Sequence, residues 1–429
     1  MVSYESVIKR IGGAIIIKIS SAGCNLLLGI LLGRLLGASF TGTFYLTITI
    51  MSILSTISRL GMDHALVKLI ASLKHDENFV GIKYINLVSL LISGLMAIAI
   101  TVLIYEYASV LATYLFSDKS LTYAFQYGAL ALVPMTLMSI QAFCLQGVEK
   151  VNQSLFLINF IWVAGSCVVV AIGTYTFSKN YIFVGYSLTF VVALVVASIW
   201  WRQFIGEVSF TYIEGFASRL FRTSLPMLVT NVMSHVMLWC PLLLLGVFSD
   251  TSSIGIYGSV GRVAGLLSFV LIATNSVIAP KISRNFVAGN LTDLVRIVRN
   301  TARVSLILSL PICLVFLLFP STVLSLFGSE FTSGATALQI LCLGHLFNCY
   351  SGSVFYTLNM TSGHKVVGII SFISATLLIA LSYILIPLYG INGAAIAASF
   401  IMILHNCLGA LAVYKMLDFV IFPKNFRFE

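Results

Sequence analysis

The sequence predicts an all-α integral membrane protein with twelve transmembrane helices, arranged as two six-helix bundles around a central cavity. Hydrophobic residues make up 59% of the 429 residues and charged residues only 9%, whereas a soluble domain averages about 45–50% and 25%. The mean hydropathy is +1.05. The apolar runs are long and lack a period-2 alternation, which indicates helices rather than a membrane barrel. These observations exclude a soluble protein.

The spans follow from the requirement that a membrane-crossing helix has about 20 apolar residues. The twelve expected spans are 11–35, 40–62, 84–107, 122–146, 153–176, 181–201, 223–248, 254–279, 302–327, 335–360, 366–388 and 391–415. We therefore divide the chain into an N-terminal bundle, 1–215, and a C-terminal bundle, 216–429.

The basic residues predict the orientation. Nineteen of the 24 Lys and Arg residues fall on the side of the N-terminus, whereas only Lys119 and Lys179 fall on the other side. Lys18, Arg34 and Arg262 lie within spans or at their rims. Because Lys and Arg concentrate in cytoplasmic loops, we expect both termini in the cytoplasm. The net charge of +10 is then a signature of topology rather than of nucleic-acid binding.

Motifs for catalysis and cofactors are missing from the sequence. No loop exceeds about 25 residues, and neither a Gly-Lys dipeptide nor an HExxH or GxSxG motif occurs. The eight cysteines lie in apolar runs without a CxxC pair, which is typical of packing residues. No cleavable signal peptide precedes the first span. We predict no enzymatic activity, no catalytic residue, no metal site and no cofactor.

A weak internal repeat links the two halves. The segments LGRLLGASFTGTFYL and LLLLGVFSDTSSIGIYGSV both carry Leu-Gly, a short polar turn, and then a glycine with an aromatic residue that opens the next span. Tyr45 and Tyr257 in these segments are 212 residues apart, close to half the chain. Parallel repeats of this kind place a substrate site between the halves near the membrane midplane.

Two basic residues lie deep within the expected spans. Lys18 is about eight residues into the first span, or about 12 Å deep, on one face with Ser21 and Asn25. Arg262 is about as far from the opposite surface in the eighth span. A charge at the bilayer centre costs about 2.5–3.5 kcal/mol on insertion scales. Either these side chains snorkel to an interface or they line an aqueous cavity.

Other polar residues have similar alternatives. Asn231 and His235 share a face of the seventh span, where they can bind a ligand or hydrogen-bond a neighbouring helix. Arg34 and Arg59 lie at span ends, where they can line the cavity or snorkel. Interior acids are nearly absent, since Asp63 falls just past the second span. A positive interior favours an anionic substrate such as a phosphate over a cationic drug.

The segment 281–303 has an amphipathic pattern. Arg296, Arg299 and Arg303 recur at helical spacing, with Leu294 and Val298 among the apolar residues opposite. This pattern predicts a cytoplasmic helix that lies on anionic lipid headgroups.

Six segments, in collinear order over nearly the whole chain, resemble polysaccharide flippases. The resemblance is to the O-antigen (Wzx-type) translocases, within the superfamily that includes multidrug extrusion proteins and the lipid II flippase. The six segments are LGRLLGASFTGTFYL, GMDHALVKLIA, GIYGSVGRVAGLLS, APKISRNFVAGN, LSLFGSEFTSGATALQIL and IPLYGINGAAIAASF.

The resemblance implies a V-shaped cavity between two bundles in the bacterial inner membrane. It implies a substrate that is an undecaprenyl-diphosphate-linked oligosaccharide, moved to the periplasmic leaflet by alternating access. The further partners expected are membrane lipids, a polysaccharide polymerase and a chain-length regulator, and no nucleic acid. Relatives often have an aspartate in the seventh span, where this chain reads Trp239-Cys240-Pro241. That departure puts a coupling role of such a carboxylate in doubt.

By this resemblance Arg59 and Arg262 match arginines of the second and eighth spans, and Lys18 takes the place of a first-span cation. We expect Lys18, Arg59 and Arg262 to hold the diphosphate, and Asn25, Asn231 and His235 to contact sugar or phosphate. Two alternatives stay open. A drug or metabolite antiporter of the same fold would favour interior carboxylates, and a non-transporting scaffold for glycan assembly would leave the buried cations dispensable.

Overall fold

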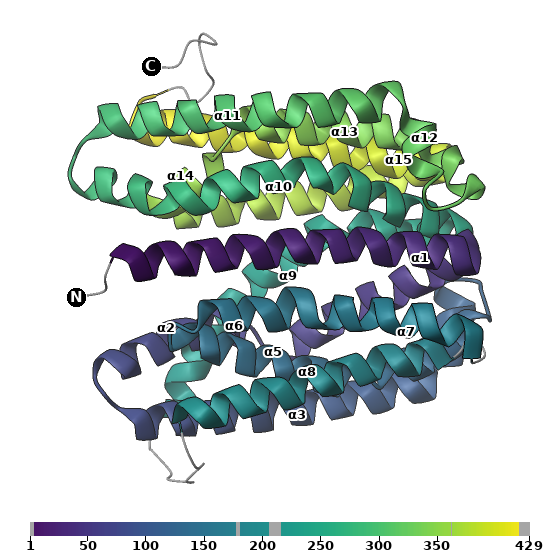
Figure 1. The fold of residues 1–429 in the computed structure, drawn as a ribbon, viewed down its shortest axis with the longest axis horizontal. Helices are drawn as coiled ribbons and strands as arrows, with labels where there is room; N and C mark the ends of the chain where they lie inside the picture. The colour runs from purple at the N-terminus through teal and green to yellow at the C-terminus, as the bar shows by residue number, and fades with distance from the viewer. Residues whose placement is uncertain (1–3, 177–180, 206–215, 362, 420–429) are drawn as a thin grey trace. The chain divides into compact units, whose positions relative to one another are not determined.

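The computed structural model describes residues 4–176, 181–205, 216–361 and 363–419. Within these ranges every regular element is a helix (Figure 1), which confirms the predicted all-α class. Lys179, both chain ends and residues 206–215, which hold the expected boundary between the bundles, lie outside the described residues. The longer elements are α1 (Tyr4–Ser58), α2 (Met62–His75), α3 (Phe79–Val110), α5 (Leu132–Gly147), α7 (Trp162–Thr176), α8 (Tyr181–Ile205), α9 (Phe216–Phe248), α10 (Thr251–Val287), α11 (Leu291–Leu318), α13 (Ala335–Ser351) and α15 (His364–Leu417). Shorter elements are α4 (Leu121–Ala129), α6 (Val151–Leu155), α12 (Pro320–Leu324), α14 (Val354–Met360), the π-helices η1 (Leu111–Leu115) and η2 (Phe156–Ile161), and the 3₁₀ helix η3 (Ser329–Gly334).

The longest helices are too long for one crossing. The apolar part of α1 has 47 residues and that of α15 has 53, or about 70–80 Å at 1.5 Å per residue, against a hydrocarbon core of about 30 Å. Each is interrupted by a glycine with non-helical backbone angles, Gly37 (φ 83°, ψ 174°) and Gly390 (φ 54°, ψ −128°). These breaks fall where the sequence predicts the junctions between spans one and two and between spans eleven and twelve.

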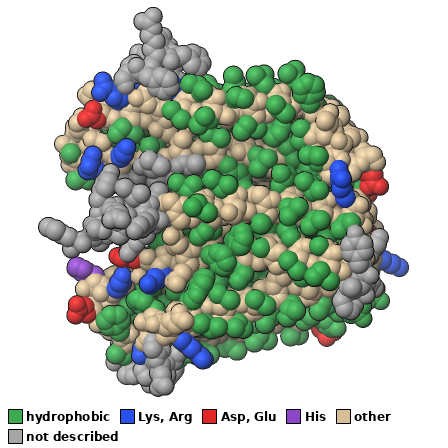
Figure 2. Space-filling model, in the orientation of Figure 1, with side chains coloured by type: hydrophobic (Ala, Val, Ile, Leu, Met, Phe, Trp, Pro, Cys, Tyr) green, Lys and Arg blue, Asp and Glu red, His purple; other side chains and the backbone are tan. Residues whose placement is uncertain are grey.

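The described residues contain eight helices long and apolar enough to cross a membrane, or nine with the bent pair α4 and α5. The broken helices α1 and α15 each account for two of the expected spans. The helix α13 has only 17 residues and ends at a break around Gly352. The total of twelve therefore stays a prediction. Figure 2 shows hydrophobic side chains over the middle of the visible face, with charged groups toward its edges, as expected for a membrane protein.

The contacts divide the chain into two compact units. The N-terminal unit comprises residues 1–36 and 43–235, and the C-terminal unit comprises residues 37–42 and 236–429. In the N-terminal unit, Tyr186 packs edge-on against Phe44 and Phe190, with ring centroids 5.6 and 5.1 Å apart. Because aromatic rings bring large contact areas, the contact of Tyr186 with Phe44 helps to fix α8 against α1, whereas Phe190 lies on α8 itself.

The C-terminal unit corrects the interpretation of residues 281–303. The helix α10 runs to Val287 and α11 begins at Leu291, so a turn interrupts the segment. Arg296 is exposed as predicted, but Arg303 is only 1% exposed, and its Nη1 donates to Asn300 Oδ1 at 3.0 Å. The expectation that Arg303 faces lipid headgroups is therefore wrong. Arg303 follows Thr301 and Ala302 on the buried side of α11, where α10 and α13 pack.

Candidate functional site

A sharp turn in the N-terminal unit joins α1 to α2 and places Arg59. Ser58 ends α1, Leu60 and Gly61 both take left-handed backbone angles (φ 49° and 74°), and Met62 begins α2. Glycine adopts that region at no steric cost. A Cβ on Gly61 would lie 2.3 Å from the carbonyl oxygen of Ser224. The backbone of α9 therefore lies directly against this turn.

Arg59 and Asp63 form a buried ion pair across the turn. Arg59 is 7% exposed and Asp63 is 6% exposed. The guanidinium Nε donates to Asp63 Oδ1 at 2.5 Å, and Nη2 donates to Oδ2 at 3.3 Å. Two parallel hydrogen bonds between planar charged groups give a strong and well-oriented contact. The charge of Arg59 is thus neutralised inside the unit.

Two hydroxyl groups complete the surroundings of Arg59, and a third supports one of them. Ser55 Oγ accepts from Nη1 at 2.6 Å, and Thr56 Oγ1 accepts from Nη2 at 3.0 Å. Ser55 Oγ also lies 3.0 Å from Thr136 Oγ1 of α5. With these bonds Arg59 uses four donor contacts of the five N–H groups that a guanidinium offers. The guanidinium is fixed from three sides.

His235 on α9 joins the same cluster through Thr56. Its Nε2 lies 2.7 Å from Thr56 Oγ1, which also donates to the carbonyl oxygen of Ser52 at 3.0 Å. A hydroxyl carries one hydrogen, so a Thr56 that donates to Ser52 accepts from His235 Nε2–H. His235 therefore resembles a histidine bonded to a neighbouring helix, one of the two alternatives that the sequence left open.

Asn231 lies one helical turn before His235 on α9. Positions 228, 231 and 235 share a face, because they are three and seven residues apart. Leu228 on this face approaches Gly61, and His235 bonds Thr56. The side-chain nitrogen of Asn231 is buried and has no hydrogen-bond partner among the described residues. A buried amide donor without a partner costs about 1–3 kcal/mol, which makes it a ready contact for a ligand oxygen.

We call Arg59, Asp63, Thr56, His235 and Asn231 the Arg59 cluster. The structure thus links Arg59 and His235, which the sequence singled out, through Thr56, and Asn231 lies one turn from His235 on the same face of α9. Asp63 follows the end of α1, as the sequence predicts, but it is buried there, and its role as the partner of Arg59 was not among the predictions. Helical spacing does not predict this pair, because the left-handed turn at Leu60 and Gly61 separates the two residues and itself brings them together.

Lys18 and Asn25 lie on the first segment of α1 and are half-buried. Lys18 forms no hydrogen bond or ion pair with any described residue, whereas Asn25 donates to the carbonyl oxygen of Ser21 at 3.0 Å. Ser21 is buried and donates to the carbonyl oxygen of Asn159 in η2 at 2.6 Å. Part of the predicted polar stripe is therefore used for packing between helices.

Arg262 belongs to the C-terminal unit. It is half-buried on α10, and its Nη1 donates to the carbonyl oxygen of Gly258, one turn earlier, at 2.9 Å. Arg34 on α1 is exposed. Among the described residues no group of three His, Cys, Asp or Glu side chains could hold a metal ion.

The profile of the family described as polysaccharide biosynthesis protein matches residues 7–286, about two thirds of the chain. The chain belongs to the polysaccharide biosynthesis protein family. A second profile, described as MatE, matches residues 224–384. The resemblance stated from the six sequence segments is confirmed.

Two curated relatives of this polysaccharide biosynthesis protein are named as transporters of glycans. A probable low-salt glycan biosynthesis flippase, Agl15 of Haloferax volcanii, is 24% identical over 401 residues, which cover 92% of this chain and 81% of the relative. A putative O-antigen transporter of Shigella flexneri is 24% identical over 223 residues, which cover 51% of this chain and 52% of the relative. Neither is named as a catalyst, in agreement with the prediction of a non-enzymatic protein.

Solved structures share the fold of this family member. An inward-facing multidrug resistance MATE family transporter of the MOP superfamily superposes with a TM-score of 0.77 at 15% identity, over 94% of this chain and 98% of that one. The lipid II flippase MurJ, in an inward closed conformation, gives a TM-score of 0.75 at 15% identity, over 93% and 86%. At these identities the comparison shows the fold alone, which is the predicted all-α membrane transporter fold.

Proposed function

We propose that this protein is a flippase for an undecaprenyl-diphosphate-linked oligosaccharide, the repeat unit of an O-antigen or a similar surface polysaccharide. The observation that carries the proposal is the match over 92% of the chain to a protein named as a glycan biosynthesis flippase. Two halves, 1–215 and 216–429, would expose a shared site alternately to the cytoplasmic and periplasmic leaflets. The protein would work in the bacterial inner membrane, with both termini in the cytoplasm, beside a polymerase and a chain-length regulator of lipopolysaccharide biosynthesis.

The half-buried cations support an anionic substrate. Lys18 and Arg262 lie within helices long enough to cross a membrane, and neither is fully exposed. A charged side chain in such a place persists mainly where function compensates its insertion cost. Ammonium and guanidinium groups both bind phosphate, the guanidinium with a two-pronged geometry. We assign Lys18 and Arg262 to the diphosphate.

Arg59 would act differently from these two cations, because its guanidinium is occupied by Asp63. It reaches a phosphate only when a phosphate oxygen replaces the carboxylate. Asn231 would supply an amide donor one turn from His235 on α9, and His235 and Asn25 would supply further polar contacts to sugar or phosphate. In this proposal the Arg59–Asp63 pair opens when substrate binds and closes again after release.

Substitution of the two cations tests the proposal. Arg262→Ala and Lys18→Ala should each strongly reduce export, because each removes a charge-assisted contact worth about 1.5–3 kcal/mol, or about ten- to a hundredfold in affinity. Arg262→Lys should keep partial activity, since a point charge still attracts phosphate. Arg262→Glu should be worse than alanine. The measurement is complementation of surface glycan in a flippase-deficient strain, with the membrane protein level measured in parallel.

Arg284→Ala is the matched control, because Arg284 lies on the same helix α10 but is exposed. Its export should equal that of the unmodified protein. Normal export by both Lys18→Ala and Arg262→Ala would contradict the proposal and favour a scaffold role. Loss of export that merely tracks loss of protein would also count against it.

A further inference from the structure

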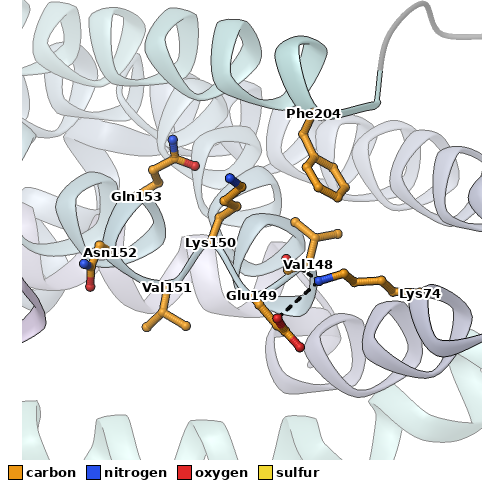
Figure 3. Close-up of a pocket in the computed structure, with 8 residues that line it drawn as sticks. All are labelled: Lys74, Val148, Glu149, Lys150, Val151, Asn152, Gln153 and Phe204. Carbon is orange, nitrogen blue, oxygen red and sulfur yellow. Dashed lines mark hydrogen bonds and ion pairs between the residues drawn. The ribbon is translucent and has the colours of Figure 1, made fainter. Parts of the chain in front are cut away.

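A cavity outside the Arg59 cluster opens at one end of the N-terminal unit. It has a volume of about 340 Å³ and is lined by Lys74 of α2, residues 148–150 of the α5–α6 connection, residues 151–153 of α6, and Phe204 of α8 (Figure 3). Lys74 lies in the last turn of α2, twelve residues after Met62, or about 18 Å along the helix from the Arg59 turn. The cavity is therefore a separate place in the fold.

The two lysines of this cavity differ in their contacts. Lys74 Nζ lies 3.3 Å from Glu149 Oε2 and donates to the carbonyl oxygen of Val148 at 3.1 Å. Lys150 is exposed, and its ammonium forms no hydrogen bond or ion pair with any described residue. Two lysines against one carboxylate leave the lining with a net positive charge. Lys150 is the cation that remains available to a ligand.

Glu149 stands in a backbone conformation that favours glycine. Its φ is 68°, at the end of α5, where Lys150 N–H donates to the carbonyl oxygen of Leu145 at 2.8 Å. Left-handed angles cost a residue with a Cβ about 1 kcal/mol relative to glycine. Strained backbone conformations of this kind cluster at functional sites. The Glu149 carboxylate holds Lys74 against the wall of the cavity.

The remaining lining combines amide groups with apolar surface. Asn152 and Gln153 supply side-chain amides, and Asn152 Oδ1 is buried without a hydrogen-bond partner among the described residues. The Asn152 amide packs toward α1, since a Cβ on Gly13 would lie 2.4 Å from Asn152 Nδ2, so Gln153 is the amide that shares the side of Lys150 (Figure 3). Val148, Val151 and Phe204 supply apolar surface beside the lysine.

We propose that this cavity binds the phosphate of a lipid headgroup, with Lys150 as the principal cation. Its place at helix ends suits a lipid, because a headgroup meets a membrane protein there and basic pockets between transmembrane helices bind anionic headgroups. Phosphate oxygens would meet Lys150 and the Gln153 amide. The first carbons of the lipid would pack on Phe204. The proposal does not depend on which substrate the protein moves.

Direct binding to the purified full-length protein tests the site. The protein is delipidated in neutral detergent, and native mass spectrometry measures binding of phosphatidylglycerol, a polyprenyl phosphate, phosphatidylcholine and inorganic phosphate. We expect phosphatidylglycerol or the polyprenyl phosphate to bind more tightly than phosphatidylcholine. Lys150→Gln should weaken this binding about tenfold or more, because it removes a charged hydrogen bond to phosphate.

Two matched controls separate the cavity from general surface charge. Lys68→Gln removes an exposed lysine of α2 that does not line the cavity, and it should leave binding unchanged. Glu149→Gln should tighten binding severalfold because it frees Lys74, whereas Glu77→Gln, at an exposed acid outside the cavity, should not. Phe204→Ser should weaken lipid binding and leave inorganic phosphate unaffected.

The lipid that binds best identifies its source. Preference for the polyprenyl phosphate over phosphatidylglycerol would place the site on the path of a lipid-linked substrate. Equal affinity for the two lipids would make it a site for bulk anionic lipid. Both results support binding of a phosphate headgroup. Binding that is unchanged in Lys150→Gln, or reduced as much in Lys68→Gln, would overturn the proposal. Because binding is measured without transport, failure here is distinct from failure of the flippase proposal.

Discussion

The N-terminal unit buries the Arg59–Asp63 ion pair, whereas the C-terminal unit has an aliphatic and an amide side chain at the two positions that the predicted internal repeat would make equivalent. The offset of 212 residues that relates Tyr45 to Tyr257 also relates Asp63 to Asn275 and Arg59 to Leu271. Asn275 is buried and accepts a hydrogen bond from Ser353 Oγ. Leu271 is buried and carries no charge at all.

One feature is common to both units. Thr56 contacts His235 Nε2 at 2.7 Å, and Ser268, 212 residues later, contacts His345 Nδ1 at 2.8 Å. The two hydroxyls are equivalent by the 212-residue offset, but the two histidines are not, since His235 lies on α9 and His345 on α13. Burial of an ion pair carries a desolvation cost that a neutral network avoids. The Arg59–Asp63 pair therefore carries a desolvation cost that Leu271 and Asn275 avoid.

The largest expected effect comes from removal of one partner of the ion pair. Asp63→Ala leaves Arg59 buried without its carboxylate and should lower the free energy of unfolding by about 3–5 kcal/mol. Asn275→Ala removes only a neutral partner and should cost about 1–3 kcal/mol. Thermal unfolding of the purified proteins in detergent measures both. The double variant Arg59→Met/Asp63→Leu should recover most of the loss, and equal losses for the two single variants would refute the contrast.

A second test compares two turns with left-handed glycines, one in each unit. Gly61 (φ 74°) meets the backbone of α9, whereas Gly289 (φ 71°) has open space around the position of a Cβ. Gly289→Ala should therefore lower the free energy of unfolding by only about 1 kcal/mol, the cost of holding alanine at a left-handed backbone angle. Gly61→Ala adds a steric clash worth about 1–3 kcal/mol. Melting temperatures and membrane protein levels check the order, and a similar loss in both would mean that α9 does not rest on the turn.

The smallest expected effect concerns the shared hydroxyl–imidazole bonds. Thr56→Val keeps the shape but removes the acceptor of both Arg59 and His235, at a cost of about 2 kcal/mol. Ser268→Ala removes a single contact with His345 and should cost about 1 kcal/mol. The same unfolding assay measures both variants. A larger loss for Ser268→Ala than for Thr56→Val would show that the charge of Arg59 adds nothing to the network.

Composition and apolar run length determined the class of this protein and most of its spans. In a bilayer every backbone polar group must be paired inside the segment, so long apolar runs leave the helix as the main solution. The junctions between neighbouring spans could also be predicted, because the apolar runs stop there. The breaks at Gly37 and Gly390 fall where short polar or glycine-containing turns separate apolar runs.

The tertiary structure decided which polar side chains meet. Lys18, Arg59 and Arg262 look alike in a sequence, yet Arg59 is paired with Asp63 and Lys18 meets no charged partner among the described residues. Arg303 looked like a surface residue and is buried. The reason is physical: a span that is apolar on nearly every side gives no periodic signal for the face that packs inward. The partner of a buried charge therefore depends on which helix lies beside it, and hydropathy does not encode that choice.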